Sequence, residues 1–315
     1  MKQINLMDRV VEGYKNVKAD KLLGIFGNPI KHTLSPVIHD TISDFYSLNE
    51  RYIPFEIENN LGDYVRAAYE LGITGLNITV PYKEKIISYL SDIDEDAKSI
   101  GAVNTLVRYK NGYKGYNTDM EGLYRSILEA GMSIKDNEIV MLGAGGAARA
   151  VAYMCFKYGA KKVYIINRSL EKAEKLAKYM NDMDKSGNVS DREKIGKEKN
   201  YERFIAVSTE EYNSIPKTGY MFIQCTSVGL KVDDGLPLIT DTDFYKKAGS
   251  AVDIIYNPAK TKFVKLMEEN DIPVINGLKM LLYQGIIANE IWNGITVSNE
   301  LSKDIYQKLC QRIYS

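Results

Sequence analysis

The chain has 315 residues, of which 45% are hydrophobic, so it is long enough for two domains with separate cores. Lys and Arg total 41, as do Asp and Glu, and the resulting net charge of zero argues against nucleic acid or an anionic membrane as a partner. Cysteines stand only at 155, 225 and 310 and histidines only at 32 and 39, which excludes a disulfide framework and makes a metal site improbable.

The N-terminal segment, MKQINLMDRVVEGYKNVKAD, lacks the continuous apolar core of a signal peptide. No later stretch reaches the roughly 18 uncharged apolar residues that a membrane span requires. We therefore expect a cytoplasmic protein whose partners are small molecules, with no nucleic acid and no membrane involved.

Short apolar runs alternate with amphipathic stretches along the chain, a rhythm typical of α/β proteins with mainly parallel sheets. The runs predicted as strands are LLGIFG from Leu22, YIPFEI from Tyr52, LNITV from Leu76, EIVMLG from Glu138, KVYIIN from Lys162, FIAV from Phe204, MFIQC from Met221, AVDIIY from Ala251 and PVING from Pro273. A helix is predicted after Asn167, with Ser169 as its N-cap. Residues 181–200 are polar and charged, which predicts an exposed loop or disordered insertion.

A glycine-rich motif follows the predicted strand EIVMLG. Gly143, Gly145 and Ala148 form a GxGxxA pattern between this strand and a helix of small residues, and a second strand ends at Asn167. A turn without Cβ atoms lets a pyrophosphate reach backbone N–H groups and the positive end of the helix. The arrangement predicts a dinucleotide site, the alternative being a glycine-rich turn that binds nothing.

The second strand of this motif ends without the acidic residue that usually binds the ribose of NAD. Asn167, Arg168, Ser169 and, one helical turn later, Lys172 stand there instead. A cationic pair suits the additional phosphate of NADP, and Arg168 can both hydrogen-bond the phosphate and stack on adenine. The alternative is that Arg168 is an ordinary surface arginine.

Four polar clusters follow apolar runs in the first half of the chain: GNPIKHTLSPVIHD from Gly27, NITVPYK from Asn77, GAVNTL from Gly101 and GYNTDMEG from Gly115. Each cluster alone is compatible with a simple turn. Lys83 ends the second cluster, and a lysine beyond the carboxyl end of a strand lies where α/β proteins bind ligands, although most lysines are solvated surface groups.

Taken in order, these clusters resemble those of the shikimate dehydrogenase family, including quinate/shikimate dehydrogenases. The resemblance extends from about Leu22 to the end of the chain and includes CTSVGL at Cys225, DIIYNPAKT at Asp253 and GLKMLLYQGIIANEIW at Gly277. It implies reversible, NADP-dependent reduction of 3-dehydroshikimate to shikimate, in the pathway to aromatic amino acids. It also implies a substrate-binding domain from 1–118 plus 279–315 and a Rossmann-type NADP-binding domain from 119–278.

By motif position, Lys83 and Asp119 correspond to the catalytic pair of this family. The resemblance assigns substrate binding to Thr33, Ser35, Thr79, Asn104, Tyr256 and Gln284. It assigns cofactor binding to Gly143, Ala144, Gly145, Gly146, Ala147, Asn167, Arg168, Ser169 and Lys172, with Glu95, Thr226, Ile254 and Gly277 as further contacts. No metal is expected.

The chemistry of the residues agrees with this assignment. Reduction of a ketone requires a hydride from nicotinamide and a proton for the developing alkoxide, and neither histidine lies in a motif suited to donate that proton. A lysine paired with an aspartate can stabilise the oxyanion and supply the proton.

The chain departs from the family pattern at Thr33, where serine is usual, and at Gln224–Ser227, where the family has Asn-Ala-Thr-Ser. An added methyl group near the substrate carboxylate can shift the preference between shikimate and quinate. The alternative within enzymes is a quinate/shikimate dehydrogenase with broader substrate or NAD use. The alternative from another class is a non-catalytic nucleotide-sensing module. The intact Lys83 and Asp119 argue against this alternative, because a sensor does not need a proton donor. The protein is expected to be a monomer or a homodimer.

Overall fold

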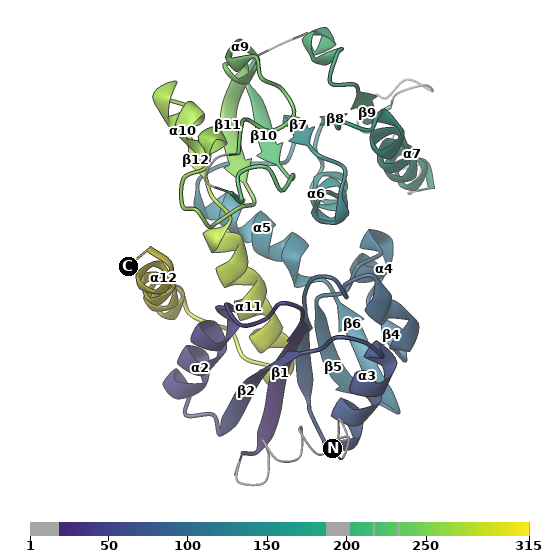
Figure 1. Ribbon diagram of the computed structural model, residues 1–315, viewed down its shortest axis with the longest axis vertical. Coiled ribbons are helices and arrows are strands. Elements are labelled where there is room, and N and C mark those ends of the chain that lie inside the picture. The colour runs from purple at the N-terminus through teal and green to yellow at the C-terminus, as the bar shows by residue number, and fades with distance from the viewer. Residues whose placement is uncertain (1–18, 187–201, 217, 232–233, 315) are drawn as a thin grey trace, which may run out of the picture. The chain divides into compact units, whose positions relative to one another are not determined.

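The structure is a computed structural model, which describes residues 19–186, 202–216, 218–231 and 234–314. It divides into two compact units: one contains the chain up to Thr118 together with the segment from Gln284 onward, and the other contains Asp119–Tyr283. Each unit is built on a six-stranded sheet with helices on both faces (Figure 1). The prediction of two α/β domains is confirmed.

The first unit contains a mixed sheet. Its strands are β1 (Lys21–Gly27), β2 (Glu50–Glu56), β3 (Gly75–Ile78), β4 (Asp92–Ile93), β5 (Thr105–Tyr109) and β6 (Gly112–Tyr116), in the order β2-β1-β3-β5-β6-β4. Its helices are α2 (Ser35–Phe45), α3 (Leu61–Glu70), the 3₁₀ helix η1 (Lys85–Tyr89), α4 (Glu95–Ile100), α12 (Asn299–Tyr314) and the part of α11 (Leu278–Asn293) from Gln284 onward.

The direction of strand β5 determines which strand ends meet at one edge of this sheet. It pairs antiparallel with both β3 and β6, whereas β1 pairs parallel with β2 and β3. The start of β5 therefore lies beside the end of β3, where the Ile78 N–H donates to the Asn104 carbonyl over 2.8 Å. The sequence analysis did not predict β4, β5 or β6. One edge of the sheet thus gathers the ends of β1, β3 and β6 and the beginning of β5.

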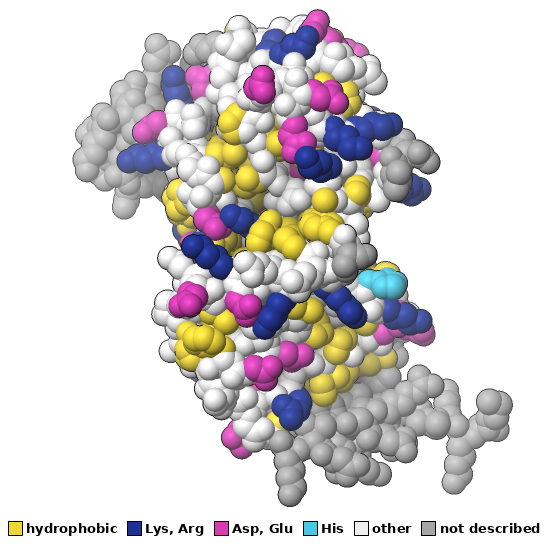
Figure 2. All heavy atoms as spheres, turned by 90° about the vertical axis from the view of Figure 1, so that its left-hand side faces the viewer, with side chains coloured by type: hydrophobic (Ala, Val, Ile, Leu, Met, Phe, Trp, Pro, Cys, Tyr) yellow, Lys and Arg dark blue, Asp and Glu magenta, His cyan; other side chains and the backbone are white. Residues whose placement is uncertain are grey.

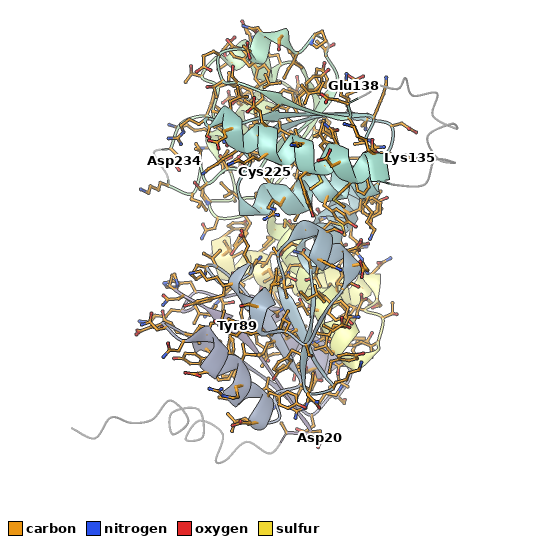
Figure 3. The ribbon with its side chains drawn as sticks, turned by 90° about the vertical axis from the view of Figure 1, so that its right-hand side faces the viewer. Asp20, Tyr89, Lys135, Glu138, Cys225 and Asp234 are labelled. Carbon is orange, nitrogen blue, oxygen red and sulfur yellow. The ribbon has the colours of Figure 1, made fainter. Side chains whose placement is uncertain are left out.

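Helices α2, α11 and α12 cover one face of this sheet and α3 and α4 the other, as Figures 1 and 3 show from two sides. Two glycines permit the close packing of α11. A Cβ on Gly285 would lie 2.9 Å from Ile38 of α2, and a Cβ on Gly75 of β3 would lie 2.4 Å from the Trp292 indole nitrogen. Since real Cβ contacts are longer, glycine is required for α11 to approach both elements this closely.

The second unit contains an all-parallel sheet in the order β12-β11-β10-β7-β8-β9. Its strands are β7 (Glu138–Leu142), β8 (Lys162–Ile166), β9 (Phe204–Val207), β10 (Tyr220–Gln224), β11 (Ala248–Asp253) and β12 (Val274–Ile275). Its helices are α5 (Thr118–Glu129), α6 (Gly146–Lys157), α7 (Leu170–Ser186), the 3₁₀ helix η2 (Tyr212–Ser214), α9 (Thr242–Tyr245) and α10 (Lys262–Glu269). In chain order these strands follow the 3-2-1-4-5-6 arrangement of doubly wound dinucleotide-binding folds, with the switch point between β7 and β10.

The predicted loop at 181–200 is wrong over its first six residues, because α7 continues to Ser186. Asn181 is buried there, and its side chain accepts a hydrogen bond from the Phe204 N–H over 3.0 Å and donates to the Phe204 carbonyl over 2.8 Å. Asp184 pairs with Arg203 at 2.8 Å. These polar residues tie the last turn of the helix to β9. Residues 187–200 lie outside the described part of the chain.

One face of the molecule shows no dominant charge (Figure 2). On the face in Figure 2, Lys and Arg side chains alternate with Asp and Glu side chains, as the equal totals of basic and acidic residues lead one to expect. Among the described residues, none of the helices combines the length and apolar character needed to cross a membrane. In the same residues, no group of three His, Cys, Asp or Glu side chains is placed to hold a metal ion.

Candidate functional site

The hydroxyl groups of Thr33 and Ser35 lie where the loop after β1 enters α2. The Thr33 hydroxyl donates to the Ser35 hydroxyl over 3.2 Å, and its oxygen accepts from the Ser35 N–H over 3.3 Å. Ser35 is the first residue of α2 and is 5% exposed, and the N-cap residue Leu34 provides no side-chain hydrogen bond to the helix. The positive end of an eleven-residue helix and two hydroxyl groups can therefore meet one anion here.

Lys83 is placed by a turn rather than by a strand. We predicted a strand through Val80, but β3 ends at Ile78, and Lys83 lies between that strand and η1. Its carbonyl accepts from the Val103 N–H over 2.8 Å, which fixes the turn against the segment before β5. Lys83 is half-buried. Thr79, directly after β3, packs so tightly that a Cβ on Gly27 would lie 2.4 Å from its methyl group.

Asn104 and Gln284 meet at the same edge of the sheet. Asn104 is 2% exposed, and its amide donates to Gln284 Oε1 over 3.5 Å and to the Thr118 hydroxyl over 2.9 Å. Its Oδ1 accepts from the Thr118 N–H over 2.8 Å, which fixes the orientation of the amide. Asp119 follows as the second residue of α5 and is half-buried. Thr118 thus links the beginning of that helix to Asn104.

A buried polar network, which the sequence analysis did not foresee, lies among these residues. His39 Nε2 is 3.1 Å from Asn77 Oδ1, and the Tyr52 hydroxyl donates to the same oxygen over 2.7 Å. Asn77 Nδ2 contacts the Thr105 hydroxyl at 3.3 Å, and that hydroxyl donates to Asn104 Oδ1 over 3.1 Å. The network therefore reaches Asn104. Alternation of asparagine and threonine with apolar residues in the strands was the only sequence signal for it.

The network also defines the chemical state of His39. Burial lowers the pKa of this imidazole to about 3, although the hydrogen bond to Asn77 acts in the opposite direction. His39 is therefore neutral near pH 7. Asn77 Nδ2 faces the Asn104 carbonyl at 3.4 Å, which can only accept, so Asn77 Oδ1 faces His39 and the proton is on Nε2. The other ring nitrogen of His39, Nδ1, lies 3.4 Å from Asn289 Nδ2, so both nitrogens have partners inside the protein. A neutral imidazole with both nitrogens bonded in this way is unsuited to donate a proton to a substrate.

In the second unit, the glycine turn lies at the switch point of the sheet. Gly143 has φ of +113°, and a Cβ on it would lie 3.0 Å from the methyl group of Thr226 in the loop after β10. Residues 145–147 at the start of α6 are exposed, and a Cβ on Gly145 would meet nothing within 4 Å. Gly145, the N-cap residue of α6, has no side chain to cap the helix. Backbone N–H groups and open space are what a dinucleotide pyrophosphate requires.

The segment after β8 is joined to this turn by Asn167. Its Oδ1 accepts from the Ala144 N–H over 3.2 Å, and its Nδ2 donates to the Ser169 carbonyl over 2.9 Å. Arg168 and Lys172 are both exposed beside it. The predicted cationic pair therefore follows the strand next to the glycine turn, where a ribose phosphate is reached in doubly wound folds.

Three further residues predicted to touch the cofactor lie in loops of the second unit, and a fourth lies in the first. A Cβ on Gly277 would lie 2.1 Å from the carbonyl oxygen of Ile254, so these two backbones are in contact. Gln224, buried at the end of β10, accepts from the Thr226 N–H and donates to the Val228 carbonyl over 2.9 Å, which shapes the loop that carries Thr226. Glu95 is exposed in the first turn of α4.

Tyr256, predicted to bind substrate, follows β11 in the second unit and is half-exposed. Burial raises the pKa of its phenol, so it is a neutral hydrogen-bonding group near pH 7. The parallel sheet, the glycine turn at its switch point and the cationic segment together define a two-domain α/β protein of the nucleotide-dependent dehydrogenase class.

Comparison with known proteins identifies the family. A family model described as "Shikimate dehydrogenase substrate binding domain" matches residues 25–106, and one described as "Shikimate / quinate 5-dehydrogenase" matches residues 123–216. This chain belongs to the shikimate dehydrogenase family.

Individual relatives cover nearly the whole chain. The "Shikimate dehydrogenase (NADP(+))" of Carboxydothermus hydrogenoformans is 37% identical over 88% of this chain and 92% of its own. The crystal structure of shikimate dehydrogenase from Aquifex aeolicus has a TM-score of 0.75 and 36% identity, covering 90% of this chain and 97% of that one. Shikimate 5-dehydrogenase from Listeria monocytogenes, in complex with shikimate and NAD, has a TM-score of 0.78 and 29% identity, covering 90% and 96%.

Proposed function

We propose that this protein is a shikimate dehydrogenase that reversibly reduces 3-dehydroshikimate to shikimate with NADPH. The observation that carries the proposal is that a chain of the shikimate dehydrogenase family has the hydrogen-bonded pairs Thr33–Ser35 and Asn104–Gln284 in its first unit. We assign substrate binding to 1–118 plus 279–315 and NADP binding to 119–278.

Lys83 and Asp119 are the proposed catalytic pair. When bound, NADPH supplies the hydride that adds to the carbonyl carbon of the substrate. The carbonyl oxygen then becomes an alkoxide, which the Lys83 ammonium stabilises and to which it donates a proton. Asp119 is proposed to orient the lysine as the proton donor for that transfer. In the reverse direction the neutral amine accepts the proton of the hydroxyl group.

The substrate has a carboxylate at one end and hydroxyl groups around its ring, and the proposed contacts match this division. Thr33 and Ser35 bind the carboxylate, helped by the positive end of α2. Thr79, Asn104, Tyr256 and Gln284 bind the carbonyl and hydroxyl groups. Thr118 fixes the orientation of the Asn104 amide, so the N–H that faces Gln284 over 3.5 Å is already directed when the substrate arrives.

The residues at the glycine turn fit NADP. Gly143–Ala147 form the turn at the start of α6, where the exposed residues 145–147 offer backbone donors. The exposed Arg168 and Lys172 offer cations for the additional phosphate, with Asn167 and Ser169 beside them. Thr226, Ile254 and Gly277, on the loops after β10, β11 and β12, and Glu95 of α4 are proposed to complete the contacts.

The direct test is an absorbance assay of NADPH formation from shikimate and NADP by the purified protein. We expect turnover that follows saturation kinetics in both substrates. Absence of NADPH formation from a folded protein, as judged by circular dichroism, would refute the proposed function.

Quinate oxidation is a second proposed activity, because Thr33 carries a methyl group where the family usually has serine and because the matched family model includes quinate dehydrogenases. One methyl group changes substrate preference by about 1–3 kcal/mol. The same assay with quinate, and with NAD in place of NADP, measures both preferences. We further propose a cytoplasmic monomer or homodimer, which light scattering after gel filtration distinguishes.

A further inference from the structure

The loop that follows β11 carries two residues of the proposed site, Ile254 and Tyr256, and is closed by a single buried carboxylate. Asp253, the last residue of β11, is fully buried. Its Oδ1 accepts from the Ile255 N–H over 3.0 Å, and its Oδ2 accepts from the Thr261 hydroxyl over 2.7 Å. One side chain thus holds the first and last parts of the segment from Asp253 to Thr261.

Thr261 connects this carboxylate to α10. It is 3% exposed and is the N-cap residue of the helix, where its oxygen accepts from the Val264 N–H over 3.1 Å. Its hydroxyl therefore donates in one direction and accepts in the other. Because α10 packs its Phe263 and Met267 into the core of the second unit, Thr261 gives the loop a rigid support.

The loop after β10 packs against Thr261 as well. A Cβ on Gly229 would lie 2.8 Å from the Thr261 methyl group, and the Gly229 N–H donates to Asp234 over 2.8 Å. Figure 3 labels Cys225 and Asp234, which lie on either side of this contact in the chain. On the other side of the loop, the Gly277 N–H donates to the Ile255 carbonyl over 3.0 Å. The segment from Asp253 to Thr261 therefore packs against the loops after β10 and β12.

Nothing in the proposed chemistry uses Asp253 or Thr261 directly, since both are buried beneath the loop. We propose that they are positioning residues, which hold the segment between them so that Tyr256 is pre-set to meet the substrate. This inference rests on the proposed function, because it requires Tyr256 to contact substrate. Pre-setting matters because a side chain that must be ordered on binding weakens the complex by the cost of ordering it.

Two matched variants of Thr261 separate positioning from packing. Thr261→Val keeps the shape of the side chain but removes the hydroxyl from both hydrogen bonds, whereas Thr261→Ser keeps the hydroxyl and loses only a methyl group. Asp253→Asn gives a second way to break the pair if Thr261→Val fails to fold. The measurements are KM and kcat for shikimate, the dissociation constant of NADP by fluorescence titration, and the midpoint of thermal unfolding.

We expect Thr261→Val to raise KM for shikimate about tenfold, as for loss of one hydrogen bond to a charged group, with NADP affinity changed less than about twofold. Thr261→Ser should remain within about twofold of wild type. In a Tyr256→Phe background the effect of Thr261→Val on KM should largely disappear, because the group being positioned has been removed.

Two results would overturn the inference while leaving the proposed function intact. One is an unchanged KM for shikimate in both Thr261→Val and Asp253→Asn. The other is an effect of Thr261→Val that is as large with Tyr256→Phe as without it. If Tyr256→Phe alone leaves kcat and KM for shikimate unchanged, the proposed role of Tyr256 fails, and the inference fails with it.

Discussion

The candidate sites of the two units differ in the burial of the groups that form them. In the first unit the proposed ligand groups are side chains, and several are buried and held by further polar side chains, as Asn104 is by Thr105 and Thr118. In the second unit the glycine turn presents exposed backbone, and the cations beside it are solvent-exposed. A change in the first site should therefore affect both stability and binding, whereas a change at the exposed cations should affect binding alone.

The largest effect is expected at Lys83. Its ammonium stabilises charge that exists only in the transition state, so Lys83→Ala should lower kcat by at least about 10²-fold while NADP affinity stays close to wild type. Steady-state kinetics with shikimate and NADP give kcat, and fluorescence titration gives the affinity. Lys85→Ala, which removes an exposed lysine two residues later, is the control and should be near wild type.

The pairing of Lys83 with Asp119 has its own test. Asp119→Asn should also be slow, and the double variant should be little worse than the worse single variant, because the two residues act as a unit. Wild-type kcat in Lys83→Ala, or losses that multiply fully in the double variant, would contradict the paired mechanism.

The next effect concerns the exposed cations of the second unit. Arg168→Ala should lower kcat/KM for NADP by about 10-fold to 100-fold, since hydrogen bonds to charged groups contribute about 1.5–3 kcal/mol, and should change the value for NAD little. Thermal stability should not change. Lys178→Ala, at an exposed position of the following helix α7, is the control. Equal losses with both cofactors would mean that Arg168 does not bind the phosphate.

The buried network of the first unit should appear in the pH dependence of stability. The pKa of His39 falls from 6.5 to about 3 on folding, so below pH 6.5 the unfolded chain binds a proton that the folded protein does not. Stability is therefore lost as pH falls from 6.5 toward 3. Between pH 7 and pH 5 this residue should account for a loss of about 2 kcal/mol.

His39→Gln removes the titrating group and keeps a donor for Asn77. Urea unfolding at the two pH values should show a smaller loss in the variant than in wild type, whatever its absolute stability. An identical loss in both proteins would show that His39 is protonated in the folded state or is not buried.

The smallest effect is expected at Ser35, where a second hydroxyl group and a helix end share the same anion. Ser35→Ala should raise KM for shikimate about fivefold, corresponding to about 1 kcal/mol, with little change in kcat because the carboxylate keeps its charge throughout the reaction. Ser88→Ala, at an exposed serine of η1, is the control. An unchanged KM would place the carboxylate elsewhere.

Local sequence determined the nine predicted strands and the glycine turn, because alternation of apolar runs and helices, and glycine at a tight turn, are properties of neighbouring residues. The hairpin of β5 and β6 also has a local signal, because the dipeptide Asn111-Gly112 marks a turn. Tyr109 pairs with Gly112 across the connection Lys110–Asn111.

Only the tertiary structure decided which polar residues are buried and which partners they find. Asn181 looks like part of a solvated segment, yet it binds the backbone of β9, and His39 looks like a residue of a turn-rich motif, yet it is a neutral donor inside the first unit. Asp253 lies in a strand both in the sequence prediction and in the structure, but its hydrogen bond with Thr261 joins residues eight positions apart. Such contacts join positions that are separated in the chain. The identity of a polar residue does not show whether water or a buried carbonyl will satisfy its hydrogen bonds.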